Sequence, residues 1–160
     1  MEPKSERVLY ETAYFKATAP LKPHIAREDG GHLILKPKQK CASRADLSPE
    51  QAKDCMRCTM LLGEAMIRGM KTRGVTIERI NYQDNGNWAF LRGKDPSFHI
   101  HLYGRVRNCA RQPFGQALFF PDPEDAYYAG LLPLDDSDIR AIREQIEALE
   151  KTEKYQTCNW

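Results

Sequence analysis

Two of the four histidines in the chain, His99 and His101, are separated by one residue in a segment where apolar and polar side chains alternate. A period of two is typical of a β-strand, whose side chains point alternately to opposite faces. The apolar face consists of Phe98, Ile100 and Leu102, and we expect it to lie in the core. The opposite face carries Ser97, His99, His101 and Tyr103. The pattern therefore aligns two imidazoles on one side of a strand, about 6.5–7 Å apart along it.

This alignment is suited to phosphoryl chemistry. An imidazole with a pKa near 6.5 is mostly neutral at pH 7, and its lone pair can attack an electrophile. A second histidine and a hydroxyl such as that of Ser97 can hold phosphoryl oxygens. Two other interpretations stay open. The histidines can lie on the solvated side of a sheet without a function, or they can bind zinc together with a third ligand such as His32.

The surrounding segments predict an α+β domain that positions this strand. Ser48, Pro49 and Gln51 form a capping-box pattern at the start of a long helix, 49–71. Further elements are expected as strands over 8–18, 32–36, 75–82, 88–91 and 97–106, and as a last helix over 138–154. This order predicts a mainly antiparallel five-stranded sheet, with one long helix after the second strand and a C-terminal helix.

Three motifs in this order resemble the histidine triad (HIT) proteins. The segment SFHIHLYGR, residues 97–105, is similar to their signature strand, in which three histidines alternate with apolar residues before a Gly and an Arg. Upstream, GGHLILKPK, residues 30–38, resembles their Gly-His strand, and DLSPE, residues 46–50, resembles the start of their long helix. The resemblance implies a HIT-like nucleotide-binding core over residues 1–108. An aromatic and Pro-rich extension, 109–160, is expected to pack on the same domain.

The resemblance also implies roles for the aligned residues. Alignment on Gly104 and Arg105 makes His99 the middle histidine, which is the nucleophile in this family, and His101 the third. The first position falls on Ser97, which departs from the family pattern. A second register, with His101 as nucleophile and Tyr103 in third place, fits the trailing Gly-Arg less well.

The implied reaction is attack of His99 on the α-phosphorus of a nucleotide phosphoramidate, anhydride or ester. It forms a nucleotidyl-histidine that water hydrolyses to release a nucleoside monophosphate such as AMP. The other ring nitrogen of His99 is expected to donate to a backbone carbonyl, while His101 and His32 hold the phosphoryl charge. The hydroxyl of Ser97 can bind phosphate, but it is a poor acid at neutral pH.

Other positions carry over less directly. His24 falls where family members place a ribose-binding residue, while Gln83 and Asn85 fall in a turn that binds phosphate in one branch of the family. The resemblance further implies a homodimer and requires neither a cofactor nor a metal ion. Two alternatives remain: a non-catalytic nucleotide-binding module of the same fold, and a metal site built on the histidines.

Composition agrees with a globular protein of 160 residues, with 41% hydrophobic and 29% charged residues. The formal net charge of +2 is too balanced to predict an extended nucleic-acid surface. No apolar run is long enough for a membrane span, and the charged start lacks the apolar region of a signal peptide. We therefore expect a cytoplasmic protein. Five cysteines, an odd number that includes the Cys55 and Cys58 pair, fit reduced thiols.

Overall fold

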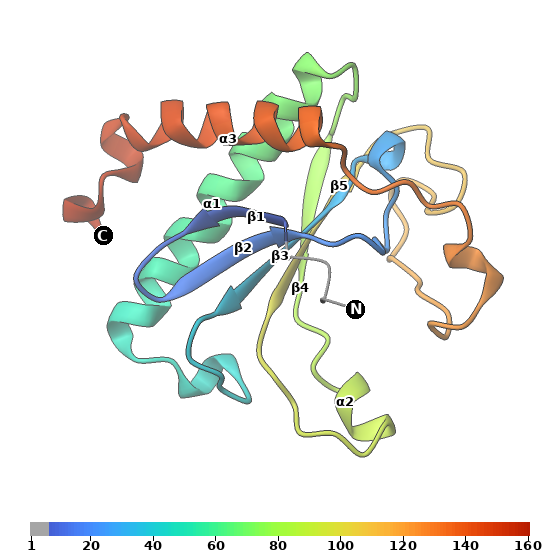
Figure 1. The fold of residues 1–160 in the computed structure, drawn as a ribbon, viewed down its shortest axis with the longest axis horizontal. Helices are drawn as coiled ribbons and strands as arrows, with labels where there is room; N and C mark the ends of the chain where they lie inside the picture. Colours follow the sequence, from blue (N-terminus) through green and yellow to red (C-terminus); the bar gives the residue numbers. More distant parts are fainter. Residues whose placement is uncertain (1–6) are drawn as a thin grey trace, which may run out of the picture.

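The computed structural model describes residues 7–160, in which a five-stranded antiparallel sheet packs against helices on one face (Figure 1). The strands are β1 (Arg7–Glu11), β2 (Phe15–Ala19), β3 (His32–Pro37), β4 (Arg79–Gln83) and β5 (Ile100–Arg105), in the spatial order β1-β2-β3-β5-β4. The helices are α1 (Pro49–Thr72), α2 (Trp88–Leu91) and α3 (Asp136–Glu150). The charged residues 1–6, on which part of the localisation prediction depends, lie outside the described residues.

This architecture confirms the predicted α+β class, the five-stranded antiparallel sheet and the two long helices. Three local predictions are wrong. The predicted strand 97–106 begins only at Ile100, so Ser97 and His99 lie before β5. The segment 8–18 is a hairpin of β1 and β2, so the long helix follows the third strand instead of the second. The segment 88–91 forms the short helix α2 and is not a strand. No helix among residues 7–160 is long and apolar enough to cross a membrane.

Helix α1 begins where the capping pattern predicts. The Ser48 side chain accepts from the N–H of Gln51, and the Gln51 side chain accepts from the N–H of Ser48. These reciprocal bonds satisfy two of the backbone donors that a helix start leaves without partners. The buried face of α1 includes Leu61, Leu62, Met66 and Met70, which belong to the same core as Leu33, Leu102 and the α3 residues Ile142 and Ile146. The apolar side of β5 therefore faces α1, as its alternation predicts.

Two close backbone approaches fix the elements around the histidine strand. A Cβ on Gly69 of α1 would lie 2.9 Å from backbone atoms of Ile142, so this glycine lets α1 and α3 pack closely. A Cβ on Gly104 of β5 would lie 2.2 Å from the carbonyl oxygen of Gly30, and Gly30 itself has a φ of 118°. Only glycine fits both positions. The close approach of Gly30 to Gly104 places the start of β3, which includes His32, directly beside β5.

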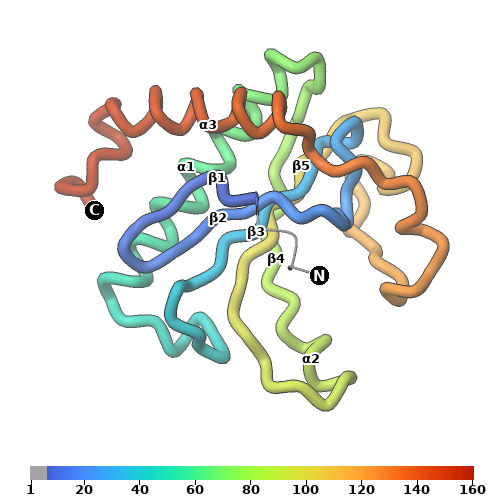
Figure 2. The backbone as a smooth tube through the Cα atoms, in the orientation of Figure 1, coloured from blue at the N-terminus to red at the C-terminus, as the bar shows by residue number. Residues whose placement is uncertain are grey.

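The segment between β5 and α3 returns to the loop before β3 (Figure 2). The N–H of Arg27 donates to the carbonyl of Leu132 at 2.9 Å, and the Tyr127 hydroxyl donates to the carbonyl of His24 at 3.2 Å. The extension therefore packs on the core at the edge where His24 and His32 lie. The division at residue 108 stays a prediction.

Candidate functional site

Four imidazoles lie together on the sheet face that points away from α1, and three of them form a continuous chain of hydrogen bonds. His99 Nδ1 lies 2.7 Å from the carbonyl oxygen of Ser97, and its Nε2 lies 3.0 Å from Nε2 of His101. His101 Nδ1 is 2.9 Å from Nε2 of His32. His32 Nδ1 accepts from the backbone N–H of His24 at 3.2 Å. This series of hydrogen bonds thus runs from a backbone donor, the N–H of His24, to a backbone acceptor, the carbonyl of Ser97.

The two ends of this series of hydrogen bonds determine which ring nitrogen of each histidine carries the proton. Because the N–H of His24 can only donate, Nδ1 of His32 must carry a lone pair, and the proton of neutral His32 is on Nε2. That proton is donated to His101 Nδ1, so the proton of His101 is on Nε2 and points at His99 Nε2. His99 then donates from Nδ1 to the carbonyl of Ser97. Four bonds are satisfied by three neutral rings, and His99 Nε2 carries a lone pair.

The electrostatics of the site agree with neutral rings. Burial, followed by repulsion from His99, lowers the pKa of His101 to about 3. Burial, with repulsion from the neighbouring histidines, places the pKa of His32 well below its ordinary value. Burial lowers the pKa of His24 to about 4. An additional proton on any of the three hydrogen-bonded rings would also point one N–H group at another. Hydrogen-bond geometry and burial therefore both favour neutral rings.

The side of β5 that carries the histidines is covered by protein and is not a solvated face. The ring of Phe120, from the segment after β5, lies 5.0 Å from the ring of His24 and 5.0 Å from that of Tyr103. Tyr103 is fully buried, and its hydroxyl lies 2.7 Å from His24 Nδ1. Sequence analysis placed Tyr103 on this strand face, although the favoured register gives it no role. It missed Phe120, because only the fold brings the extension onto this face.

The structure places the remaining predicted site residues, Gln83, Ser97 and Asn85, in three different positions relative to the histidines. Gln83, at the end of β4, is the register partner of His101 and shares its face, because directly opposite residues of antiparallel strands point the same way. Ser97 lies before β5 and meets His99 through its backbone carbonyl. Asn85 lies in the turn after β4, where its carbonyl accepts from the N–H of Trp88 at 3.3 Å. The structure therefore places Gln83 opposite His101 in the sheet and Asn85 in the adjoining turn.

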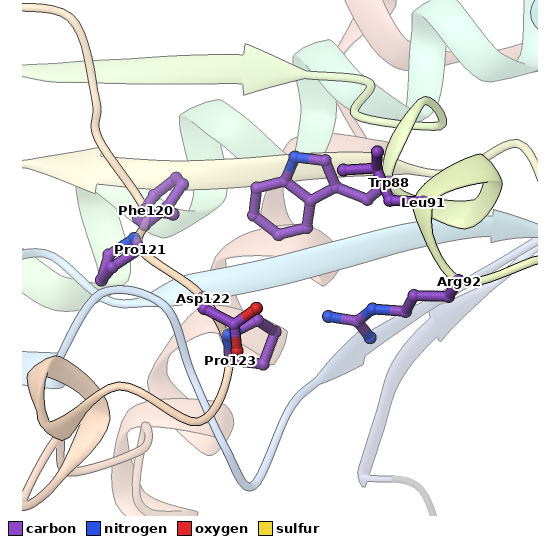
Figure 3. A pocket seen from close by; sticks show the side chains of 7 residues that line it. All are labelled: Trp88, Leu91, Arg92, Phe120, Pro121, Asp122 and Pro123. Carbon is purple, nitrogen blue, oxygen red and sulfur yellow. The ribbon is translucent and has the colours of Figure 1, made fainter.

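Two hollows open beside His24. One, of about 330 Å³, is lined by Lys22, Pro23, His24, Pro123 and Tyr128. The other, of about 320 Å³, lies between Trp88, Leu91 and Arg92 on one side and residues 120–123 on the other (Figure 3). Sequence analysis missed the residues of the second hollow, because it placed 88–91 in a strand.

A metal ion fits these histidines poorly. Nitrogens of His24, His32 and His101 lie within 4.8 Å of one another. However, the rings of His24 and His32 stack at 30° to each other, so their in-plane lone pairs do not converge. His32 Nε2 and His101 Nδ1 are hydrogen-bonded at 2.9 Å, shorter than the separation of about 3.3 Å between two ligands of a tetrahedral zinc ion with 2.0–2.1 Å bonds. The cluster is organised by hydrogen bonds between imidazoles.

Comparisons with known proteins identify the fold. No family model matches the sequence, and a search of curated proteins gives no match. Solved structures do match. A hypothetical histidine triad nucleotide-binding protein of Sulfolobus tokodaii has a TM-score of 0.59 at 18% identity, with 95% of this chain and 91% of that chain covered. A Hit-like protein of Bartonella henselae gives 0.58 at 15% identity, covering 88% of this chain and 87% of its own. A zinc-bound histidine triad protein of Mycobacterium smegmatis gives 0.57 at 19% identity, covering 93% and 89%. The chain has the fold of the histidine triad proteins.

Proposed function

We propose that this protein is a nucleotide hydrolase or nucleotidyl transferase that acts at the α-phosphate of a nucleotide phosphoramidate, anhydride or ester. The observation that carries the proposal is the pair of bonds made by His99. Its Nδ1 donates to the carbonyl of Ser97 at 2.7 Å, which fixes the lone pair on Nε2. That nitrogen lies 3.0 Å from Nε2 of His101, whose N–H is the kind of donor that phosphoryl transfer needs beside its nucleophile.

In the first step, His99 Nε2 attacks the α-phosphorus, a P–N bond forms, and the bond from phosphorus to the leaving group breaks. The incoming phosphoryl oxygen takes the place of His99 as acceptor for the His101 N–H. His32, which donates to His101 Nδ1, keeps that N–H directed at the phosphate. Gln83, on the same face as His101, is proposed to hold a further phosphoryl oxygen, and Asn85 to support the turn beside it.

In the second step, water attacks the same phosphorus, the P–N bond breaks, and the nucleoside monophosphate leaves with His99 restored. An alcohol or second nucleotide in place of water would make the reaction a transfer. The leaving group needs a proton in the first step, and Ser97 is a weaker source than an imidazole. We therefore expect good leaving groups to react faster than poor ones. His24 is proposed to contact the ribose hydroxyls.

The experiment is AMP release from an adenosine phosphoramidate and from a diadenosine polyphosphate, followed by chromatography. His99→Asn should abolish release, and a denaturing quench of the wild-type reaction should trap protein carrying one added AMP. Lys94→Gln, at an exposed residue of the loop before the same strand, is the matched control and should keep the wild-type rate. Full activity in His99→Asn would reject His99 as the nucleophile.

A second candidate function is favoured by one residue. Ser97 replaces the first histidine of the triad, and a chain that lost its acid could retain nucleotide binding alone. AMP binding measured by calorimetry, without release from any nucleotide tested, would select this non-catalytic module.

Three expectations from the family resemblance belong to the same proposal. They are a homodimer, a cytoplasmic location, and a nucleotide-binding core over 1–108 that carries the extension 109–160. Light scattering of the full chain tests the first, and a mass equal to one chain would reject it.

A further inference from the structure

The hollow between α2 and residues 120–123 has the character of a binding pocket for a flat molecule. Its walls are the indole of Trp88, the phenyl ring of Phe120 and the side chain of Leu91. Its volume of about 320 Å³ lies at the lower end of the range for small-molecule sites, which is about 300–1,000 Å³. A single aromatic heterocycle is therefore the kind of group that it can enclose.

The pocket lies next to the proposed reaction centre. The ring of His24 is 6.1 Å from that of Trp88 and 5.0 Å from that of Phe120. The ring of His24 is also 5.3 Å from that of His101. The His24 ring thus lies near both the hollow and His101, which is hydrogen-bonded to His99. A group bound there can belong to the same molecule as a phosphate at His99.

Two opposite charges give the pocket its polar character. Figure 3 shows the guanidinium of Arg92 and the carboxylate of Asp122 pointing toward one another from the two sides of the hollow. Asp122 is held in place because its Oδ1 accepts from the N–H of Glu124 at 3.0 Å. Within residues 7–160, no ion pair joins Arg92 to Asp122. Both side chains are exposed and line the same hollow as Trp88 and Phe120.

We propose that this hollow is a nucleobase site and that its preferred base is guanine. The inference rests on the proposed function, because it assigns a substrate class to the same site. Stacking on Trp88 and Phe120 accommodates the flat ring. The O6 and N7 acceptors of guanine match a guanidinium such as that of Arg92. Its N1–H and N2–H groups are donors, and they match the carboxylate of Asp122.

Other bases match this pair less completely. Adenine offers one exocyclic amine to the carboxylate, and it has no neighbouring ring N–H. Uracil offers a smaller surface for stacking. The structure therefore assigns a preference for guanine nucleotides over adenine nucleotides, and for purines over uridine nucleotides.

Calorimetric titration of GMP, AMP and UMP tests this assignment, because binding does not depend on turnover. GMP should bind the wild-type protein most tightly. Trp88→Ala should weaken GMP binding by about tenfold or more, since stacking on an aromatic side chain contributes about 1–3 kcal/mol per base. Asp122→Asn should reduce the ratio of GMP to AMP affinity by about tenfold. Phe90→Ser is the matched control in α2, because Phe90 is 68% exposed and lies outside the pocket lining.

A second readout tests the location of the base and guards against misfolded variants. The chain has two tryptophans, so Trp160→Phe leaves Trp88 as the sole indole. GMP should quench its fluorescence with the dissociation constant found by calorimetry. An unchanged GMP affinity in Trp88→Ala, or UMP binding as tightly as GMP, would overturn the nucleobase site. GMP binding without hydrolysis of any guanine nucleotide would contradict the catalytic proposal and support the pocket.

Discussion

His101 donates from Nε2 to Nε2 of His99 across 3.0 Å, so the two side chains are joined as donor and acceptor before any substrate is present. The direction of this donation follows from the backbone N–H of His24, which donates to His32 at the other end of the series of hydrogen bonds. The local backbone before β3 thereby selects which nitrogen of His99 has the lone pair. His32 acts in this arrangement as a positioning residue.

The neutral histidines make stability depend on pH. Burial is the main cause that lowers the pKa of His101 to about 3 and of His24 to about 4, whereas an unfolded histidine titrates near 6.5. Below pH 6.5 the unfolded chain therefore binds more protons than the folded chain. The free energy of unfolding should fall as the pH falls from 6.5 toward 3, and this contribution should be fully present above 6.5.

Urea unfolding at pH 7, 6, 5 and 4 measures this dependence. Carboxylates titrate in the same range, so the informative quantity is the difference between wild type and His101→Gln. The variant should lose less stability on acidification, because it lacks one buried group that resists protonation. Parallel curves for the two proteins would contradict the prediction.

The contact between Gly104 and Gly30 predicts a second effect. A Cβ at Gly104 would lie 2.2 Å from the carbonyl oxygen and 2.6 Å from the carbonyl carbon of Gly30, and backbone atoms cannot rotate away. Gly104→Ala should lower the free energy of unfolding by about 1–3 kcal/mol, the usual cost of overpacking. Turnover should fall as well, because β3 and β5 must separate and His32 moves from His101.

Denaturant unfolding and AMP release measure the two effects of Gly104→Ala. Gly86→Ala is the matched control, since a Cβ there meets only Asp84 Oδ1, at 3.8 Å. If both alanine variants unfold at the same urea concentration, the backbone contact does not constrain the strands.

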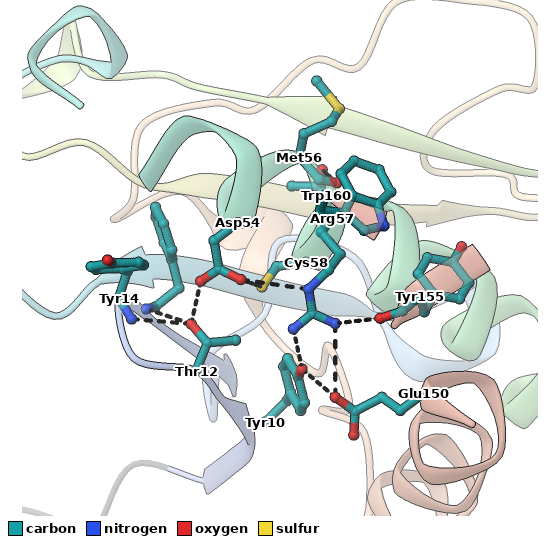
Figure 4. A network of polar contacts seen from close by, with 12 residues as sticks. Tyr10, Thr12, Tyr14, Asp54, Met56, Arg57, Cys58, Glu150, Tyr155 and Trp160 are labelled. Carbon is teal, nitrogen blue, oxygen red and sulfur yellow. Dashed lines mark hydrogen bonds and ion pairs between the residues drawn. The ribbon is translucent and has the colours of Figure 1, made fainter. Parts of the chain in front are cut away.

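A buried arginine on α1, Arg57, is hydrogen-bonded to the C-terminal segment (Figure 4). Arg57 is 3% exposed and donates to the Tyr10 hydroxyl at 2.8 Å and to the Tyr155 carbonyl at 3.2 Å. Its guanidinium also lies 3.6 Å from an Asp54 oxygen and 3.8 Å from a Glu150 oxygen. Arg57 thus joins α1 to β1 and to the end of the chain.

Arg57→Gln should destabilise the protein by about 1–3 kcal/mol, because removal of the guanidinium leaves buried hydrogen-bonding groups without their partner. Trypsin should also cleave faster after Lys151 and Lys154. Arg68→Gln on the same helix removes an exposed ion pair with Glu64 and should cost less than about 1 kcal/mol. Equal stability of the two variants in urea would show that the buried network contributes no more than the surface pair.

The sequence predicts those features that depend on local patterns. The cap at Ser48 and the alternation around Ile100 are read from neighbouring residues, and both agree with the structure. The turn between β1 and β2 was missed because it contains neither glycine nor proline. Instead, Thr12 Oγ1 accepts from the N–H of Phe15 at 3.0 Å. The apolar residues of α2 resembled a strand, since four residues cannot display a helical period.

The site was predictable only in part, for a physical reason. His101 lies in β5, and Ser97 and His99 lie directly before it, so their spacing in the sequence already brings them close together. The contact of Phe120 with His24 joins segments far apart in the chain, and no local periodicity encodes it. The tautomers likewise require the backbone N–H of His24 to meet His32, which only the folded loop provides.

The remaining prediction concerns the acid that protonates the leaving group. In Ser97→His, the backbone carbonyl still accepts from His99 Nδ1, and an imidazole is added beside the nucleophile. General acid catalysis contributes about 10²–10⁴-fold, so AMP release from substrates with basic leaving groups should rise by at least about tenfold. Release of a nitrophenolate, which needs no proton, should change little. Measured across a series of leaving groups, the dependence of rate on leaving-group pKa should become shallower, whereas Ser97→Ala should not flatten it. An equal rise for all leaving groups would mean that the added imidazole improves binding instead of proton transfer.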